Sequence, residues 1–353
     1  MPMTDWRVFL DERGASFADG AVSDFGDGPG ELASARDTAV LCDLAPLAAI
    51  GVSGPEAAAF LQGQLTSDVT MLADGASQLS AWCSPKGRVL ANFLLRRESG
   101  ERFELLLPAS LTEPMIKRLR MYVLRAKVEI ADVRGDAVRL GLGGPAAAAC
   151  IAATIGVTPA MHHSAAIDGG TLIVLAGNRF LLLAAPAHAS MLWNTLSTKA
   201  RPAGFACWEW LTVRAAVPVV TPPTQEAFIP QMLNLDALEA LAFAKGCYAG
   251  QEIVARTQYL GRLKERLALA HIDGARPEAG SRLFAIGFGE QPCGTVVNAA
   301  TAPGGGADFL AVVQTAALAD GALRWGDPDG PPVTLLPLPY ALPASRGRPG
   351  RTA

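Results

Sequence analysis

The order of strand and helix signals constrains the fold of this chain more than any other feature of its sequence. A short apolar strand at 48–52 precedes a helix at 57–64, whose start is marked by a Ser-Gly-Pro-Glu run. Strands at 75–83, 88–96 and 102–107, a helix at 111–121 and a strand at 127–131 follow. Strands divided by two helices in this order predict an α+β domain of the ferredoxin-like type over residues 45–132.

A second stretch, residues 133–262, carries a similar pattern. It holds a strand at 138–142, an alanine-rich helix at 145–155, a strand pair at 171–175 and 179–184, and a helix at 188–199. A further helix from Cys207 to Ala216 ends before Pro218. We therefore expect a second α+β domain of the same kind.

The C-terminal region differs, because residues 263–342 contain strand signals only. These strands are expected at 266–272, 282–286, 294–299, 309–313 and 333–336, with turns rich in Gly and Pro between them. Short strands at this spacing predict a small antiparallel β-barrel. Residues 1–44 are expected to hold a leader, loose at 14–30, together with the first elements, and residues 343–353 are expected to be disordered.

Composition limits the function classes. Half of the 353 residues are hydrophobic and 18% are charged, which favours large buried cores over disorder. The net charge of -3 supplies no overall positive field for nucleic acid. The sequence has no long apolar run and no secretory or transit pattern at its N-terminus, so we expect no membrane span and a cytoplasmic location. Its six cysteines and four histidines form no CxxC or HExxH motif, so no metal site is predicted.

The segment KGCYAGQE at 245–252 carries most of the chemical information. Its two glycines, Gly246 and Gly250, allow backbone conformations and close approaches that other residues resist. Lys245 lies two residues from Cys247, and an ammonium pointing the same way would favour the reactive thiolate. Gln251 and the following Glu252 can hydrogen-bond back to the amides of the loop. A cysteine beside glycines is also explained by tight packing, and the spacing alone leaves both interpretations open.

KGCYAGQE resembles the KGCYxGQE signature of the YgfZ family, a folate-binding branch of the glycine-cleavage T-protein superfamily. The surrounding sequence resembles the same family from about residue 45 to 340. The segments that carry this likeness are FLQGQLTSDV at 60–69, CSPKGR at 83–88, YVLRAKV at 122–128, FIPQ at 228–231, NLDAL at 234–238, IVAR at 253–256 and Gly261.

The resemblance implies a T-protein-like ring of two ferredoxin-like α+β domains and a C-terminal antiparallel β-barrel, around a hole that holds tetrahydrofolate. It implies a role in the assembly or repair of iron–sulfur client proteins, including enzymes that modify tRNA. Cys247 and Lys245 match the functional pair of the signature and are the expected catalytic residues. Trp208 matches a folate-associated tryptophan, since an indole can stack on a pterin and donate one hydrogen bond, although anchoring of its helix explains it equally well. The other residues expected to bind folate are Tyr248, Gly250, Gln251, Glu252, Arg256 and Arg125.

Three positions depart from the patterns of related proteins. Aminomethyltransferases resemble this family but carry an acidic residue in the strand where this chain has Asn92, and an amide cannot transfer a proton at neutral pH. Leu47 stands in place of a second folate-associated tryptophan. Arg214 stands where relatives often have Glu, and it could meet the glutamate tail of folate, another carboxylate or only solvent. Glycine-cleavage chemistry is therefore disfavoured, and whether the chain is an enzyme stays open.

Basic residues gather in the expected helix at 111–121 and just beyond it, and again after the signature. A solvated helix face explains them as simply as an RNA or a polyglutamate tail does, so no nucleic-acid partner is predicted. Three functions are therefore considered. The first is a folate-binding accessory protein for iron–sulfur clients with Cys247 as its working thiol. The others are a tetrahydrofolate-dependent aminomethyl or one-carbon transferase, and a non-catalytic scaffold stabilised by folate.

Overall fold

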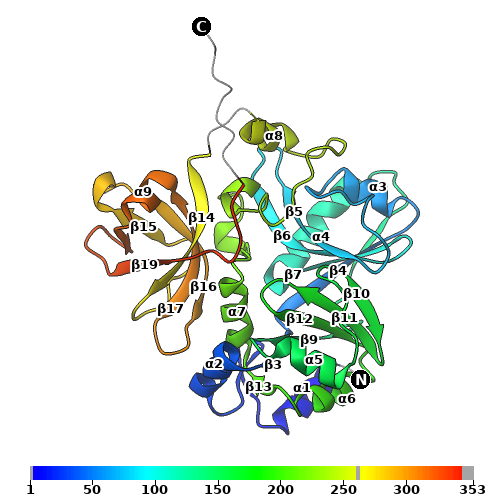
Figure 1. Cartoon of the computed structure of the whole chain (residues 1–353). Coiled ribbons are helices and arrows are strands. Elements are labelled where there is room, and N and C mark those ends of the chain that lie inside the picture. The colour runs from blue at the N-terminus through cyan, green and yellow to red at the C-terminus, as the bar shows by residue number, and fades with distance from the viewer. Residues whose placement is uncertain (1–2, 260–262, 344–353) are drawn as a thin grey trace.

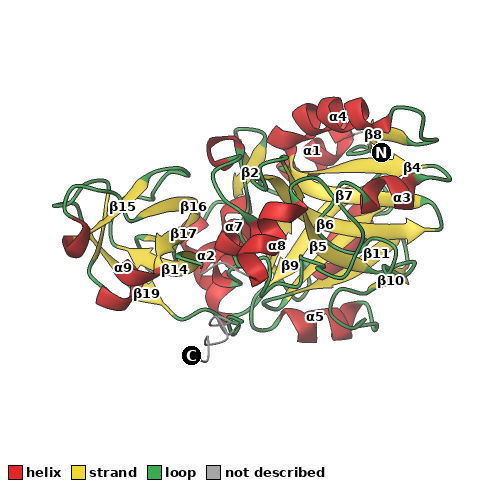
Figure 2. Cartoon of the chain, turned by 90° about the horizontal axis from the view of Figure 1, so that it is seen from above, coloured by secondary structure: helices red, strands yellow, loops and turns green. Residues whose placement is uncertain are grey.

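The structure, a computed structural model, describes residues 3–259 and 263–343. Two β-sheets with helices on their outer sides lie next to a closed β-barrel (Figures 1 and 2). The α+β class with a C-terminal barrel, expected from the sequence, is confirmed. Among the described residues, no helix combines the length and the apolar character that crossing a bilayer requires.

The first sheet has five strands in the order β5-β6-β7-β4-β8. Helix α4 covers it by burying Leu111, Met115 and Leu119, which recur every four residues and form one apolar stripe. The elements expected between residues 45 and 132 are all present, with small shifts of their ends. They are β4 (Leu47–Ser53), α3 (Ala57–Gln62), β5 (Ser77–Cys83), β6 (Val89–Ser99), β7 (Arg102–Pro108), α4 (Ala109–Val123) and β8 (Glu129–Asp132).

The second sheet has six strands in the order β10-β11-β12-β9-β3-β13. Three helices pack on the outer side of this sheet. Two of them are α5 and α6, and the third is α1 (Met3–Asp11) at the N-terminus. The strands are β9 (Val138–Gly143), β10 (Ser164–Ile167), β11 (Gly170–Leu175), β12 (Arg179–Ala184) and β13 (Arg201–Ala203), and the helices between them are α5 (Ala147–Thr154) and α6 (Ala189–Leu196).

The expectation of a loose leader at 14–30 is wrong. This segment forms β1 (Ser16–Ala18), β2 (Ala21–Asp24) and the start of α2 (Gly28–Asp37), and β3 (Val40–Asp43) then pairs with both β9 and β13. Its Gly, Ala and Asp residues suggested a flexible chain, but Asp27 caps α2 by accepting from the Gly30 amide at 3.0 Å. Phe25 packs the segment against Trp193 of α6, with the two ring centres 5.7 Å apart.

Helix α7 (Phe205–Arg214) runs between the second sheet and the barrel (Figure 1). The chain then passes through two 3-10 turns, η1 (Pro222–Thr224) and η2 (Pro230–Leu233), before reaching the KGCYAGQE segment and α8 (Gln251–Tyr259). The helix α8 was not expected from the sequence.

The barrel closes in the order β14-β17-β16-β15-β18-β19. The five expected strands are present, and the three-residue β18 is an addition. The elements are β14 (Glu265–Ile272), β15 (Arg282–Ala285), η3 (Ile286–Phe288), β16 (Gly294–Thr301), β17 (Ala307–Gln314), α9 (Thr315–Asp320), β18 (Leu323–Trp325) and β19 (Pro332–Leu336). The tail expected to be disordered lies, beyond Pro343, outside the described residues.

Four apolar cores hold these parts. One fills the barrel, and two lie under the outer helices of the two sheets. The fourth joins the inner faces of both sheets, α7 and the barrel, with Leu94, Leu181, Leu211 and Leu310 among its members. In this shared core, residues of both sheets, of α7 and of the barrel contact one another.

Candidate functional site

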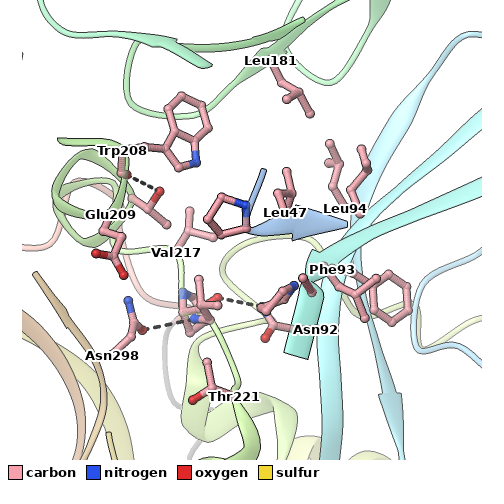
Figure 3. Close-up of a pocket in the computed structure, with 18 of the residues that line it drawn as sticks. Leu47, Asn92, Phe93, Leu94, Leu181, Trp208, Glu209, Val217, Thr221 and Asn298 are labelled. Atoms are coloured by element: carbon pink, nitrogen blue, oxygen red, sulfur yellow. Dashed lines mark hydrogen bonds between the residues drawn. The ribbon is translucent and has the colours of Figure 1, made fainter. Parts of the chain in front are cut away.

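A cavity of about 590 Å³, called the central cavity below, lies where the two sheets, α7 and the barrel meet (Figure 3). Most of its wall is apolar, including Leu47, Leu94, Leu181 and Val217, and a small number of polar groups face it. A concave, mainly apolar site with few polar groups is typical of a small-molecule site. Leu47 lines the cavity with an aliphatic side chain.

Trp208 on α7 lines this cavity, and only 7% of its surface is exposed. One side of the indole lies so close to Gly141 of β9 that an added Cβ there would be 2.6 Å from the ring. The indole nitrogen points into the cavity, and no acceptor among the described residues binds it (Figure 3). Trp208 therefore offers a ligand an edge and one N–H donor, and much of its area is used in packing.

Arg179 at the start of β12 is a cation of the cavity wall that the sequence analysis missed. Its Nε donates to the Ala176 carbonyl at 3.0 Å, and its Nη1 donates to Thr212 Oγ1 at 2.8 Å. The guanidinium carbon lies 5.3 Å from the centre of the Trp208 ring. Burial lowers the pKa of Arg179 to about 10.

Glu209, next to Trp208 on α7, is an acid of the cavity that the sequence analysis also missed (Figure 3). Burial raises the pKa of its carboxyl, and Arg276 of the barrel, 3.4 Å away, opposes that rise. About a third of the side chain remains exposed. The sequence feature that could have identified Glu209 is its position as a charged residue between two tryptophans, Trp208 and Trp210.

Asn92 on β6 lines the cavity but uses both ends of its amide to hold the backbone. Its Nδ2 donates to the Pro218 carbonyl at 2.7 Å, and its Oδ1 accepts from the Val220 amide at 2.9 Å (Figure 3). The side chain thus fastens the segment after α7 to the first sheet. It has no acidic group to move a proton.

A second cavity of about 720 Å³ lies on the opposite side of α7, where Trp210 and Arg214 face it. It shares the lining residues Leu79, His162 and Ala176 with the central cavity. Arg214 lies with its Nη1 3.5 Å from Asp308 of the barrel, so it meets a carboxylate of the chain itself. Burial lowers the pKa of His162, whose Nδ1 has no hydrogen-bond partner within the described parts of the chain.

The KGCYAGQE segment packs against the first sheet rather than lining the central cavity. Gly250 has φ +81°, and a Cβ added there would lie 2.5 Å from the Ser84 carbonyl oxygen, so a larger residue would be strained. Gly246 shows no such requirement toward the described residues, because nothing lies within 4 Å of an added Cβ, and close approach of another molecule at this glycine stays a prediction. Gln251 Oε1 accepts from the Tyr248 amide at 3.2 Å, a bond back to the loop.

Lys245 is buried and fixes the loop to the segment that follows α3. Its Nζ donates to the carbonyls of Leu65 at 2.6 Å and Ser67 at 2.8 Å, and it lies 5.2 Å from the centre of the Tyr248 ring. Burial lowers the pKa of Lys245 to about 8 and raises that of the buried Tyr248 phenol. The ammonium is thus directed at two backbone oxygens.

Cys247 is exposed, whereas the five other cysteines are buried. Glu252 and Arg256 on α8 are exposed as well, and so is Arg125 after α4. Of the nine residues expected at the site, the structure brings Trp208 to the central cavity, while Lys245, Cys247, Tyr248, Gly250 and Gln251 form a separate loop. Cys247 is not among the residues that line the central cavity.

Comparisons with known proteins define the class of fold. The family model of the GCVT N-terminal domain matches residues 12–164. The crystal structure of the glycine cleavage system aminomethyltransferase T from Bartonella henselae is similar over 97% of both chains, with a TM-score of 0.75 and 18% sequence identity. The chain therefore has the T-protein fold.

Closer relatives specify the family within that fold. The tRNA-modifying protein YgfZ of Pectobacterium carotovorum subsp. carotovorum (strain PC1) is 33% identical over 88% of this chain and 94% of its own length. The tRNA-modifying protein YgfZ of Cronobacter sakazakii (strain ATCC BAA-894) is 34% identical over 88% and 95%. This chain belongs to the YgfZ family, which confirms the resemblance seen in its sequence.

Proposed function

We propose that this chain binds a folate in its central cavity and acts as an accessory protein for the assembly or repair of iron–sulfur proteins. Cys247 is its working thiol. Clients that modify tRNA fit this proposal, because the curated relatives are named tRNA-modifying proteins. The observation that carries the proposal is the pairing of a preformed apolar cavity with one exposed thiol on the family signature.

The cavity residues fit a folate in chemical type. A pterin is flat and edged with hydrogen-bonding groups, and the wall offers broad apolar surface, the free Trp208 N–H and the Glu209 carboxylate. Tetrahydrofolate, when bound, supplies a carrier for one-carbon units. The residues of the chain would hold and orient it and exclude water from most of its surface. Tyr248, Gly250, Gln251, Glu252, Arg256 and Arg125, which the resemblance suggested as ligands, do not line the cavity, so we assign them to the loop and the surface instead.

The thiol fits the iron–sulfur role because thiolates are the preferred ligands of iron–sulfur clusters. No group of three metal-binding side chains occurs in the described residues, so the proposal places the cluster on the client protein. Each of the six cysteines is free, which suits a reducing compartment, and we place the function in the cytoplasm.

The thiol is tested by Cys247→Ser in cells that lack their own YgfZ-family protein. Because the side chain is exposed, we expect unchanged stability, within about 0.5 kcal/mol, together with loss of rescue of an iron–sulfur enzyme activity. Cys293→Ala, which alters a buried thiol of the barrel, is the control and should rescue. Full rescue by Cys247→Ser would remove the role of this thiol.

Folate binding is tested by calorimetry with tetrahydrofolate. Trp208→Phe keeps a ring but removes the N–H that points into the cavity, so we expect affinity to fall roughly 3- to 10-fold. Trp325→Phe is the matched control, since it removes an indole N–H that donates to Ser281 in the barrel, away from the cavity. Equal affinities of all three proteins would contradict the assignment of Trp208.

Aminomethyl transfer is a weaker candidate for this cavity. Asn92 stands where an acid would be needed, and both ends of its amide already bind backbone groups. Formation of methylene-tetrahydrofolate from an amine donor at a useful rate would revive that candidate. A scaffold role with no chemistry would instead be supported by ligand-induced stabilisation combined with full rescue by Cys247→Ser.

A further inference from the structure

We infer that Arg179 binds a carboxylate of the ligand that occupies the central cavity. The inference states that the cavity binds a negatively charged group of its ligand at Arg179. The position of that group then sets the orientation of the ligand in the cavity. The identity of that ligand as a folate rests on the proposed function.

The first observation is that the Arg179 guanidinium is buried without a counter-ion. The residue is 4% exposed, and no carboxylate lies within ion-pair distance among the described residues. Its two hydrogen bonds go to neutral acceptors, the Ala176 carbonyl and the Thr212 hydroxyl. Desolvation accounts for its lowered pKa, with no opposing effect from an acid. A buried charge that stays unpaired is costly to folding, so a pairing group from outside explains it.

The second observation is that Arg179 differs from the other arginines buried within the described chain. Arg96 forms an ion pair with Glu104 at 2.8 Å. Arg139 is placed near Glu104 and Asp43, whose charges favour its cationic form. Neither residue lines the central cavity, whereas Arg179 does. Of the arginines buried within the described chain, the one without an acid is thus the one that faces the space for a ligand.

The third observation is the position of the free donor. Nη2 of Arg179 makes no hydrogen bond to any described residue, so the guanidinium keeps donors for a ligand after binding Ala176 and Thr212. The Trp208 ring lies next to it, with the guanidinium carbon 5.3 Å from the ring centre, a distance at which a cation is attracted to the ring. A guanidinium with free donors matches a carboxylate in both charge and geometry. Folates carry carboxylates on the glutamate end, and pterins without that end carry none.

The test compares three probes by calorimetry: tetrahydrofolate, p-aminobenzoylglutamate and 6-methyltetrahydropterin, which has no carboxylate. In Arg179→Met, we expect the affinity for the two carboxylates to fall roughly 10- to 100-fold and the affinity for the pterin to stay unchanged. Arg179→Lys should retain part of the affinity, because lysine keeps the positive charge but lacks the paired N–H donors of the guanidinium. Arg139→Met, a buried arginine outside the cavity, is the control and should bind all three like the wild type.

Thermal unfolding separates a ligand-binding role from a structural one. Arg179→Met removes an unpaired charge and should melt no lower than the wild type, whereas Arg96→Met leaves the half-buried Glu104 without its partner and should melt lower. Equal loss of affinity for the pterin and the carboxylates, or no loss in Arg179→Met, would overturn the inference and leave folate binding standing. Failure of wild type to bind tetrahydrofolate and the pterin, with p-aminobenzoylglutamate bound through Arg179, would overturn the proposed ligand alone. Binding of none of the three probes would overturn both.

Discussion

At the scale of single residues, Lys245 is a cation whose burial makes stability depend on pH. Its pKa is about 8 in the folded chain against an ordinary value of 10.5. Between these values the unfolded chain holds a proton that the folded chain has lost, so this residue makes stability rise with pH in that window. We expect Lys245→Met to abolish the rise, which is roughly 1–3 kcal/mol between about pH 8 and 10.

Urea unfolding of both proteins at several pH values between 7.5 and 10 measures this effect. The buried cysteines oppose it, because burial raises the pKa of Cys83 and Cys207 to about 12 and stability then falls as unfolded thiols ionise. Those thiols are present in both proteins, so the difference between the two stabilities isolates Lys245. A difference that does not change with pH would show that the lysine is not desolvated as the structure indicates.

Individual residues of the site were predictable only where local sequence carried a signal. The signature identified the loop with Cys247, and the tryptophan on the predicted helix identified Trp208. The contacts of Lys245 with Leu65 and Ser67 span just over half of the chain, and no local spacing encodes them. Arg179 and Glu209 were detectable only as charges inside apolar runs, which gives a reason to examine such charges first.

At the scale of elements, helix α7 is joined to the barrel through the buried Asp308. Its Oδ2 accepts from Trp210 Nε1 at 2.9 Å and lies 3.5 Å from Arg214 Nη1, and its Oδ1 lies 2.8 Å from His271 Nδ1. Because one carboxylate joins three side chains, we expect Asp308→Asn to lower the free energy of unfolding by roughly 1–3 kcal/mol. Denaturant unfolding measures this loss.

The matched control is Asp273→Asn, since Asp273 lies 3.4 Å from the other nitrogen of His271 but is fully exposed. An exposed partner contributes little, so this change should stay within about 0.5 kcal/mol of the wild type. Similar losses in the two variants would mean that Asp308 contributes no more than an ordinary surface acid, and that α7 is held to the barrel by apolar packing.

Elements with a clear period or a clear stop were predicted well. Helix α4 has an apolar stripe and α7 ends before Pro218, so both were expected close to their actual bounds. Some strands of three or four residues, namely β3, β13 and β18, were missed, because their sequences are too short to show alternation. They are stabilised by pairing with strands from distant parts of the chain, which local sequence does not reveal.

At the scale of the whole molecule, the central cavity exists only because all parts of the chain meet. Asp19 lines it from the N-terminal hairpin, Asn92 from the first sheet, Leu181 from the second and Asn298 from the barrel. The order of elements predicted the separate sheets and the barrel, but the packing between them depends on the shared core and could not be read from it. A ligand in this cavity contacts elements that are far apart in sequence, which leads to a prediction about the entire fold.

We expect tetrahydrofolate to slow amide hydrogen exchange at once in the hairpin β1–β2, in β6, in α7 and in the second half of β16, because each contributes to or adjoins the cavity wall. Mass spectrometry at short labelling times, before global opening contributes, measures the change. Strand β10 at the outer edge of the second sheet has no residue in the wall and serves as an internal control. If a single element held the ligand, only that element would be protected, and the prediction of protection across the whole fold would be wrong. Protection confined to α8 and the loop before it would instead move the binding site to the signature and away from the cavity.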